Sequence, residues 1–277
     1  MKGQMSSFDV ARIVAELRPY IGSHARKSYH PHWEQVVLRL NPKEEPQVDL
    51  VIVRGKRVYL SRRDRPMPPN PSAFSMLLRK HLLNGRFVDV RQHGFDRILT
   101  LDFDTRDGMR SLVIEMFRDG NVLLLDAEGV IIQPLTNVKY AKRILKRGEI
   151  YEFPPAQIDP RTLKIDELKP LLTESDADVV RTLASRANLA GAYAEAVCEI
   201  ADISTERMAA DLDDEEIAAI ISGLHSLTEK LDRGTGGLVI LAPAAKAPLR
   251  EAGDNPLALD AVFEEHAREV LPFALPA

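Results

Sequence analysis

Short segments of alternating apolar and polar residues, separated by tight turn signals, fill the chain between residues 86 and 126. The turn signals are Asp107-Gly108 and Asp119-Gly120, dipeptides that readily supply the positive φ angles of hairpin turns. Strands joined by such short turns pair antiparallel, because a parallel pair needs a crossover of a dozen or more residues. The pattern therefore predicts an antiparallel sheet. Its strands are expected at residues 86–92, 96–103, 110–117, 121–126 and 129–133.

Two helices and three further strands are predicted before this region. An apolar stripe from Val10 to Ile21, with Ser7 as the cap, indicates a helix over about residues 8–21. Asn70-Pro71 predicts the start of a second helix, over about 71–83, because proline is favoured at the first helical position. The expected fold class of this part is α+β, with helices packed on antiparallel sheets. The additional strands are expected at residues 34–40, 48–53 and 57–60.

The pattern changes at "YEFPPAQIDP", residues 151–160. Helical periodicity follows, and Asp213 with Glu216 fits a capping box at the start of the last helix. We expect an α+β domain over 1–160, an all-α domain over 161–233, and a tail over 234–277. Helices are expected at 176–186, 188–202 and 213–232, and the tail is expected to hold a strand at 236–241 and a helix at 258–271.

Residues that could catalyse a reaction or bind a metal are sparse. Cys198 lies among alanines in a predicted helix, which is typical of a small core residue. His30 and His32 form the one tight histidine pair in the sequence, and no third ligand can be placed beside them. The sequence contains no nucleophile elbow, phosphate-binding loop or dinucleotide fingerprint. We therefore expect a protein with no catalytic residues, no metal and no small-molecule cofactor.

The cellular compartment is predicted from three features that the sequence lacks: a pair of cysteines, a secretory signal and a membrane-spanning segment. The single cysteine excludes an intramolecular disulfide. The N-terminus has no continuous apolar region of a secretory signal, and the apolar runs are shorter than the ~20 residues of a membrane span. We expect a cytoplasmic protein without a membrane partner.

Charge is segregated along the chain, although the net charge is only −4. Residues 54–97 hold eleven lysines and arginines against three acids, a net charge of +8, whereas residues 173–233 have a net charge of −9. A basic region of this kind suits a polyanion, with phosphate contacts expected from Arg62, Arg63 and Arg65. Three aromatic residues lie among the basic ones and are predicted to stack on bases. They are Tyr59, Phe95 and Tyr140.

The doublet Asp96-Arg97 follows Gly94 in the stretch "QHGFDRI". If a strand begins at Asp96, its side chain and that of Arg97 point to opposite faces, so an ion pair between them is not expected. A hairpin tip that carries a donor fork and an acceptor suits unpaired base edges. On residue chemistry alone, a solvated turn is the commoner meaning of such a doublet.

Several motifs in order resemble the NFACT-N domain, which opens the RqcH/NEMF family, also known as fibronectin-binding protein A-like. The segment 173–231 is similar to the helical hairpin domain that follows it in that family. The matching motifs are "SSFDVARIVAEL", "NPSAFSMLLRKHLLNGRFVDVRQHGFDRILTLDF", "EMFRDGNVLLLD", "LKRGEIYEFPP" and "NLAGAYAEAVCEIADI". The resemblance implies a domain folded like the N-terminal domain of formamidopyrimidine-DNA glycosylase, followed by an all-α domain of helix-hairpin-helix type.

The resemblance also implies partners and sites. The family binds large ribosomal subunits obstructed by peptidyl-tRNA, recruits tRNA, and supports template-free C-terminal tailing of the stalled chain. Lacking the family's coiled coil and NFACT-R domain, the chain is expected to be a fragment or a stand-alone homologue, with its tail packing back or leading to that coiled coil. The family's Asp-Arg pair, which contacts the anticodon region, falls on Asp96 and Arg97. Further RNA-binding residues are implied at Arg79, Lys80, His81, Glu115, Met116, Arg118 and Asn121.

An alternative from another class is a DNA repair glycosylase or lyase, whose fold is similar. Those enzymes use an N-terminal proline followed by glutamate, whereas Met1 is followed here by Lys2, and their zinc finger needs four cysteines. Asn188 resembles an asparagine of the glycosylase site but carries no chemistry by itself. A surface adhesin is a third interpretation, and it conflicts with the missing secretion signal.

Overall fold

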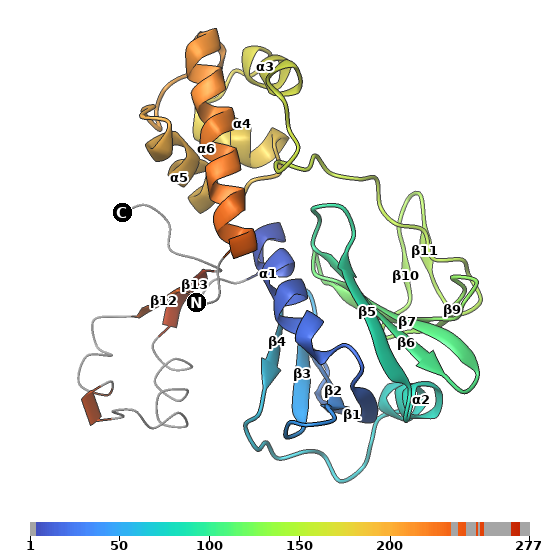
Figure 1. Ribbon diagram of the computed structural model, residues 1–277. Coiled ribbons are helices and arrows are strands. Elements are labelled where there is room, and N and C mark those ends of the chain that lie inside the picture. The colour runs from blue at the N-terminus through green and yellow to red at the C-terminus, as the bar shows by residue number, and fades with distance from the viewer. Residues whose placement is uncertain (1–3, 234–237, 242–247, 249, 252–266, 272–277) are drawn as a thin grey trace. The chain divides into compact units, whose positions relative to one another are not determined.

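The computed structural model describes residues 4–233, 238–241, 248, 250–251 and 267–271 (Figure 1). The chain divides into two compact units. The sheet unit contains Val10–Pro155 together with Gln4 and Met5, and the helical unit contains Ser6–Asp9 and the chain from Ala156 onward. Each unit is described by itself.

The sheet unit is built on nine antiparallel strands in the order β4-β3-β2-β1-β5-β6-β7-β8-β9. Seven of these strands were expected from the alternation and the turn signals, and an eighth, β9, from a shorter apolar run. The strands are β1 (His24–His32), β2 (Gln35–Asn41), β3 (Val48–Val53), β4 (Arg57–Ser61), β5 (Arg86–Gln92), β6 (Ile98–Thr105), β7 (Gly108–Glu115), β8 (Asn121–Leu125) and β9 (Ile131–Pro134).

The sheet consists of two halves that share one core. β1 pairs with β2 along most of its length but with β5 only at His24 and Arg86, so the halves β1–β4 and β5–β9 diverge there. A single cluster of buried apolar residues nevertheless draws on both halves, with Leu50 from one and Leu101 from the other. The helices α1 (Ser7–Leu17) and α2 (Ala73–Leu82) add apolar side chains to this cluster.

Both helix starts differ by a residue or two from the prediction. Ser6, rather than Ser7, caps α1: its hydroxyl accepts from the amide of Asp9, whose carboxylate accepts from the amide of Ser6. A short 3-10 turn, η1 (Arg18–Tyr20), then replaces the predicted last turn. α2 begins after Ser72, whose side chain accepts from the amide of Ser75, so Asn70-Pro71 was the wrong cap.

One whole strand and one key boundary were wrongly predicted. β1 was missed because its sequence, "HARKSYHPH", is polar and contains bulges that break the two-residue alternation. β6 starts at Ile98, so Asp96 and Arg97 lie in the turn before it rather than in the strand. A small two-stranded sheet, β10 (Val138–Lys139) and β11 (Ile144–Leu145), was also not predicted.

Between Ala156 and Arg233 the helical unit holds four α-helices, and none of the described helices is long and apolar enough to cross a membrane. Asp213 and Glu216 form the expected capping box, each accepting from the other's amide. The first helix was missed because Pro170 lies inside it. The elements are α3 (Ile165–Thr173), α4 (Val179–Arg186), α5 (Gly191–Ile200), η2 (Ala209–Asp211) and α6 (Asp214–Arg233).

Two short strands are described in the tail. β12 (Leu238–Leu241) pairs antiparallel with β13 (Ala267–Leu271). β12 lies where a strand was predicted. β13 replaces the end of the helix predicted over 258–271, and residues 258–266 lie outside the described residues.

Candidate nucleic-acid interface

Several turns of the sheet unit meet at one surface, which we call the turn face. It comprises the β1–β2, β3–β4, β5–β6 and β7–β8 turns together with Gln4. Within each half of the sheet, alternate turns of antiparallel strands lie at the same end. The two halves are joined there because the backbone of Gly55, in the β3–β4 turn, packs against the backbone of the β7–β8 turn.

Glycine is needed on both sides of this junction. Gly120 has φ +64°, and a Cβ atom there would overlap the N and Cα atoms of Gly55. A Cβ on Gly55 would lie 2.9 Å from the carbonyl oxygen of Arg118. Arg118 itself has φ 53°, a left-handed conformation that is uncommon for a side chain of this kind. The backbone junction therefore fixes where Arg118 lies.

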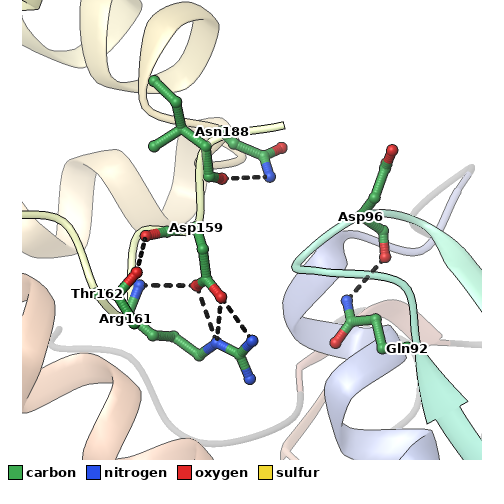
Figure 2. Close-up of polar contacts among 7 residues, drawn as sticks. Gln92, Asp96, Asp159, Arg161, Thr162 and Asn188 are labelled. Atoms are coloured by element: carbon green, nitrogen blue, oxygen red, sulfur yellow. Dashed lines mark hydrogen bonds and ion pairs between the residues drawn. The ribbon is translucent and has the colours of Figure 1, made fainter. Parts of the chain in front are cut away.

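Asp96 and Arg97 lie half-buried in the β5–β6 turn. The Oδ1 atom of Asp96 accepts from the amide of Arg97 at 2.6 Å, and the amide of Asp96 donates to the carbonyl of His93 at 3.0 Å. The Gln92 side chain donates to the carbonyl of Asp96 at 2.8 Å (Figure 2). These bonds close the turn, so its backbone is well defined. As expected, the two side chains do not form an ion pair with each other, although the reason is the turn and not a strand.

Gln4 connects Arg97 and Arg118 of the turn face. The Arg97 guanidinium donates to the side-chain oxygen of Gln4 at 3.1 Å. The side-chain nitrogen of Gln4 (Nε2) donates in turn to the backbone carbonyl of Arg118 at 3.4 Å. The amide of Met116 also donates to the carbonyl of Arg97 at 2.8 Å. Among the described residues, neither Arg97 nor Arg118 lies within ion-pair distance of a carboxylate. Both guanidinium groups therefore keep donors for an anionic ligand.

Glu115 is buried beneath this surface and held by two partners. Arg143 donates to both carboxylate oxygens, at 2.5 and 3.1 Å, and the Tyr151 hydroxyl donates to Oε1 at 2.9 Å. Burial and the nearby Glu115 carboxylate raise the pKa of Tyr151 far above its ordinary value, so it remains a donor. This buried cluster ties the β10–β11 segment to the end of β7.

Three residues expected to bind RNA have no exposed surface to offer. Met116 and Asn121 are fully buried, and Glu115 is 1% exposed. The Asn121 side chain exchanges hydrogen bonds with the backbone of Thr136, donating at 2.8 Å and accepting at 3.1 Å. In this structure these three side chains support the turn face from below. Direct contact with RNA, as expected from the sequence, would require them to be exposed first, which costs free energy.

The aromatic residues expected to stack on bases differ in exposure. Phe95 is 1% exposed, so the expectation was wrong for this residue. Tyr140 is half-buried, and the guanidinium groups of Arg118 and Arg143 lie 5.5 and 4.9 Å from its ring centroid. Tyr59 accepts a hydrogen bond from Arg65 at 3.1 Å.

The basic loop after β4 does not join the turn face. It begins at the other end of β4 from the β3–β4 turn, and Arg62 and Arg63 line a polar cavity of about 170 Å³ with Arg39 and Asp49. Arg62 forms an ion pair with Glu45. The arginines of this loop, predicted to contact phosphate, therefore lie apart from the turn face.

Arg79 and its neighbours on α2 are also separate from the turn face. Arg79 donates to the carbonyl of Ser28 at 2.9 Å and lies over the Tyr29 ring. His81 adjoins the β6–β7 turn, at the opposite end of its half of the sheet, and Lys80 is exposed beside it. Burial, with Arg110 and Lys80 nearby, lowers the pKa of His81 below its ordinary value.

Other residues singled out in the sequence have structural partners. The Nδ1 atom of His30 lies 3.0 Å from the Ser72 hydroxyl. Asn188, with φ 56°, ends α4 and donates to the carbonyl of Ile158 at 3.0 Å (Figure 2). Cys198 is buried, and burial raises the pKa of its thiol to about 11. In the described part of the chain, no group of three or more histidine, cysteine or acidic residues could hold a metal ion.

Sequence reasoning missed four residues of this region. Trp33, in the β1–β2 turn, is 59% exposed, and the Arg54 guanidinium lies 5.1 Å from its ring centroid. His93 stacks on Phe153, which is 40% exposed, with ring centroids 3.9 Å apart. Neither contact has a local sequence signal, because each joins residues that are distant along the chain.

Comparison with known proteins places the chain in a family. The model of the family "NFACT N-terminal and middle domains" matches residues 6–248. The chain belongs to this NFACT family. The resemblance inferred from the sequence motifs is thereby confirmed.

Two curated relatives show how the chain compares with longer family members. The chain is 32% identical over 242 residues to the archaeal Rqc2 homolog aRqcH of Methanocaldococcus jannaschii, a match that covers 83% of this chain and 36% of the relative. It is 30% identical over 175 residues to the Rqc2 homolog RqcH of Bacillus subtilis, covering 59% of this chain and 29% of the relative. The NFACT chain thus spans about a third of the length of these relatives.

A solved structure shares the fold. The N-terminal part of the fibronectin/fibrinogen-binding protein from Streptococcus suis superimposes with a TM-score of 0.68 at 21% identity, covering 87% of this chain and 88% of that one. At this identity the likeness concerns the fold alone, and it supports the α+β class expected for the N-terminal part.

Proposed function

We propose that this NFACT chain is the tRNA- and large-subunit-binding module of a ribosome quality-control factor. Its relatives bear the names of Rqc2 and RqcH homologues and of ribosome quality control complex subunits. In this proposal the module acts by binding and not by catalysis. The tRNA that it holds serves the template-free C-terminal tailing of a stalled nascent chain on the large subunit.

The observation that carries the proposal is the chemistry of the turn face. Arg97 and Arg118 are joined through Gln4 and, among the described residues, have no carboxylate partner. Asp96 lies beside them and offers an acceptor within a backbone fixed by its own turn. Arginine suits phosphates and base acceptors, and a carboxylate suits base amino groups, so the pair fits an unpaired anticodon loop.

The test is the affinity of the chain for tRNA, measured by fluorescence anisotropy with the double substitution Asp96→Ala and Arg97→Ala. By analogy with one bidentate base-edge contact, the doublet as a whole should contribute ~1–3 kcal/mol, so we expect binding weaker by about 5- to 150-fold. The matched control replaces Lys169 and Asp214, an exposed ion pair of the helical unit, by alanine. This control also removes one cation and one anion, and its affinity should equal that of the unchanged protein.

Two further measurements separate this function from others. Equal tRNA binding by the folded Asp96/Arg97 variant and the control would refute the assignment. A covalent adduct trapped by borohydride on DNA with an abasic site would favour the glycosylase interpretation instead. Cosedimentation of the chain with large ribosomal subunits that carry peptidyl-tRNA tests the proposed binding to the ribosome. If the chain does not cosediment, the proposal is restricted to tRNA binding.

A further inference from the structure

Trp33 is the only tryptophan of the chain, and it is exposed in an unusual setting. It lies in the β1–β2 turn with 59% of its surface accessible, although large apolar side chains are generally buried. The Arg54 guanidinium lies 5.1 Å from its ring centroid, and the His32 ring is tilted beside it at 5.6 Å. An exposed indole with a guanidinium over its ring is a ready aromatic platform.

Arg54 is fixed in place by contacts on both sides. Its amide donates to the carbonyl of Glu34 at 2.7 Å, and its guanidinium donates to the Thr136 hydroxyl at 2.8 Å. Thr136 is in turn held by the buried side chain of Asn121. The position of the guanidinium over the Trp33 ring therefore depends on a chain of bonds that reaches the base of the turn face.

The surroundings of Trp33 favour an anionic partner. The nearby Glu34 is neutralised by an ion pair with Lys56 at 2.9 Å. In the described part of the chain, Arg54 lies within ion-pair distance of no carboxylate. Next to Arg54, Gly55 packs against the backbone of Arg118, so within the turn face the platform adjoins the β7–β8 turn.

We infer that Trp33, backed by Arg54, stacks on an unpaired base of the RNA that the turn face binds. The inference rests on the proposed function and adds a stacking site to it. Every base has a π-face, so stacking tolerates any sequence and complements the more selective contacts of Asp96 and Arg97. A guanidinium over one side of the indole favours a base on the other side and adds positive charge near its phosphate.

Because Trp33 is the only tryptophan, its fluorescence reports on this site directly. We expect saturating tRNA or single-stranded RNA to quench the emission of the full chain, corrected with free tryptophan amide for light absorption by the RNA. Fully paired RNA of equal charge should leave the emission nearly unchanged. Quenching to the same extent by paired RNA, or none by tRNA that is bound, would overturn the inference.

Variants give an independent readout by anisotropy of labelled tRNA. Trp33→Ala should weaken binding about fivefold or more, whereas Trp33→Phe, which keeps an aromatic face, should retain most of the affinity. Equal affinities of the unchanged protein and Trp33→Ala would refute the stacking site while leaving the proposed function intact. If the unchanged protein does not bind tRNA at all, both fail. Quenching by a protein partner or by lipid vesicles, with none by RNA, would also overturn the inference.

Discussion

Replacing Gly120 by alanine tests how the turn face is assembled. A Cβ atom at this position would overlap the backbone of Gly55 and lie 2.9 Å from the carbonyl oxygen of Glu115. The left-handed backbone costs a non-glycine residue ~1–2 kcal/mol, and the forced separation of two packed turns costs a further ~1–3 kcal/mol. We therefore expect Gly120→Ala to lower the free energy of unfolding of the sheet unit by ~2–5 kcal/mol.

Gly129 provides the matched control. It has φ +78°, but a Cβ atom there would meet no atom within 4 Å. Gly129→Ala should therefore cost only the conformational term of ~1–2 kcal/mol. The difference between the two variants isolates the contact between the β3–β4 and β7–β8 turns.

Urea unfolding followed by Trp33 fluorescence is the suitable assay, because the single tryptophan lies in the sheet unit. The slope of the transition should stay the same in both variants, so that the midpoints can be compared. If Gly120→Ala is no less stable than Gly129→Ala, the close approach of the turns does not stabilise the fold and the reasoning fails. A second expected effect is weaker tRNA binding by Gly120→Ala at urea concentrations where it is folded, because Arg118 shifts with the turn.

Three further predictions concern stability. Arg143→Met leaves the Glu115 carboxylate buried without its ion pair and should cost ~3–5 kcal/mol, whereas Tyr151→Phe removes one hydrogen bond to that charge and should cost ~1.5–3 kcal/mol; equal urea midpoints would contradict both. The pKa of His81 is lowered in the folded state. Below about pH 6.5 the unfolded chain therefore binds more protons than the folded chain, and the free energy of unfolding should decrease as the pH is lowered. The difference in unfolding free energy between pH 7.5 and 5.5 should shrink in His81→Gln, and an unchanged difference would refute the role of this group. Ser72→Ala should cost ~0.5–2 kcal/mol through loss of the α2 cap, with Ser72→Asp retaining most of the stability.

The parts of the fold predicted correctly are those specified by local sequence. Asp119-Gly120 separates two apolar segments, and the structure has β7 and β8 on either side of it. Asp213 and Glu216 likewise mark the start of α6. β1 could not be predicted in this way, since its ladder partners are supplied by β2 and its own side chains are mostly polar. α3 was hidden because Pro170 lies inside it, whereas a proline usually ends or kinks a helix.

The candidate site was only partly accessible from sequence. Asp96 and Arg97 were noticed as a turn doublet, and the family motif gave them a predicted role, which stays a prediction. The surrounding arrangement depends on how the sheet halves meet, which no local pattern specifies. For this reason the sequence could not show that the basic loop at Arg62 and the helix at Lys80 lie apart from the doublet. The contact of Arg54 with Trp33 arises within the β1–β4 half, because the β2–β3 pairing extends to the hydrogen bond between the Arg54 amide and the Glu34 carbonyl.

The most direct test of the account is to map which residues touch tRNA, by ultraviolet cross-linking of the unmodified chain followed by mass spectrometry. We predict cross-links in the turn face, at residues 93–97 of the β5–β6 turn, at 117–120 of the β7–β8 turn and at Trp33 of the β1–β2 turn. Cross-links confined to residues 62–65 and 79–81, with none in the turn face, would contradict the central claim.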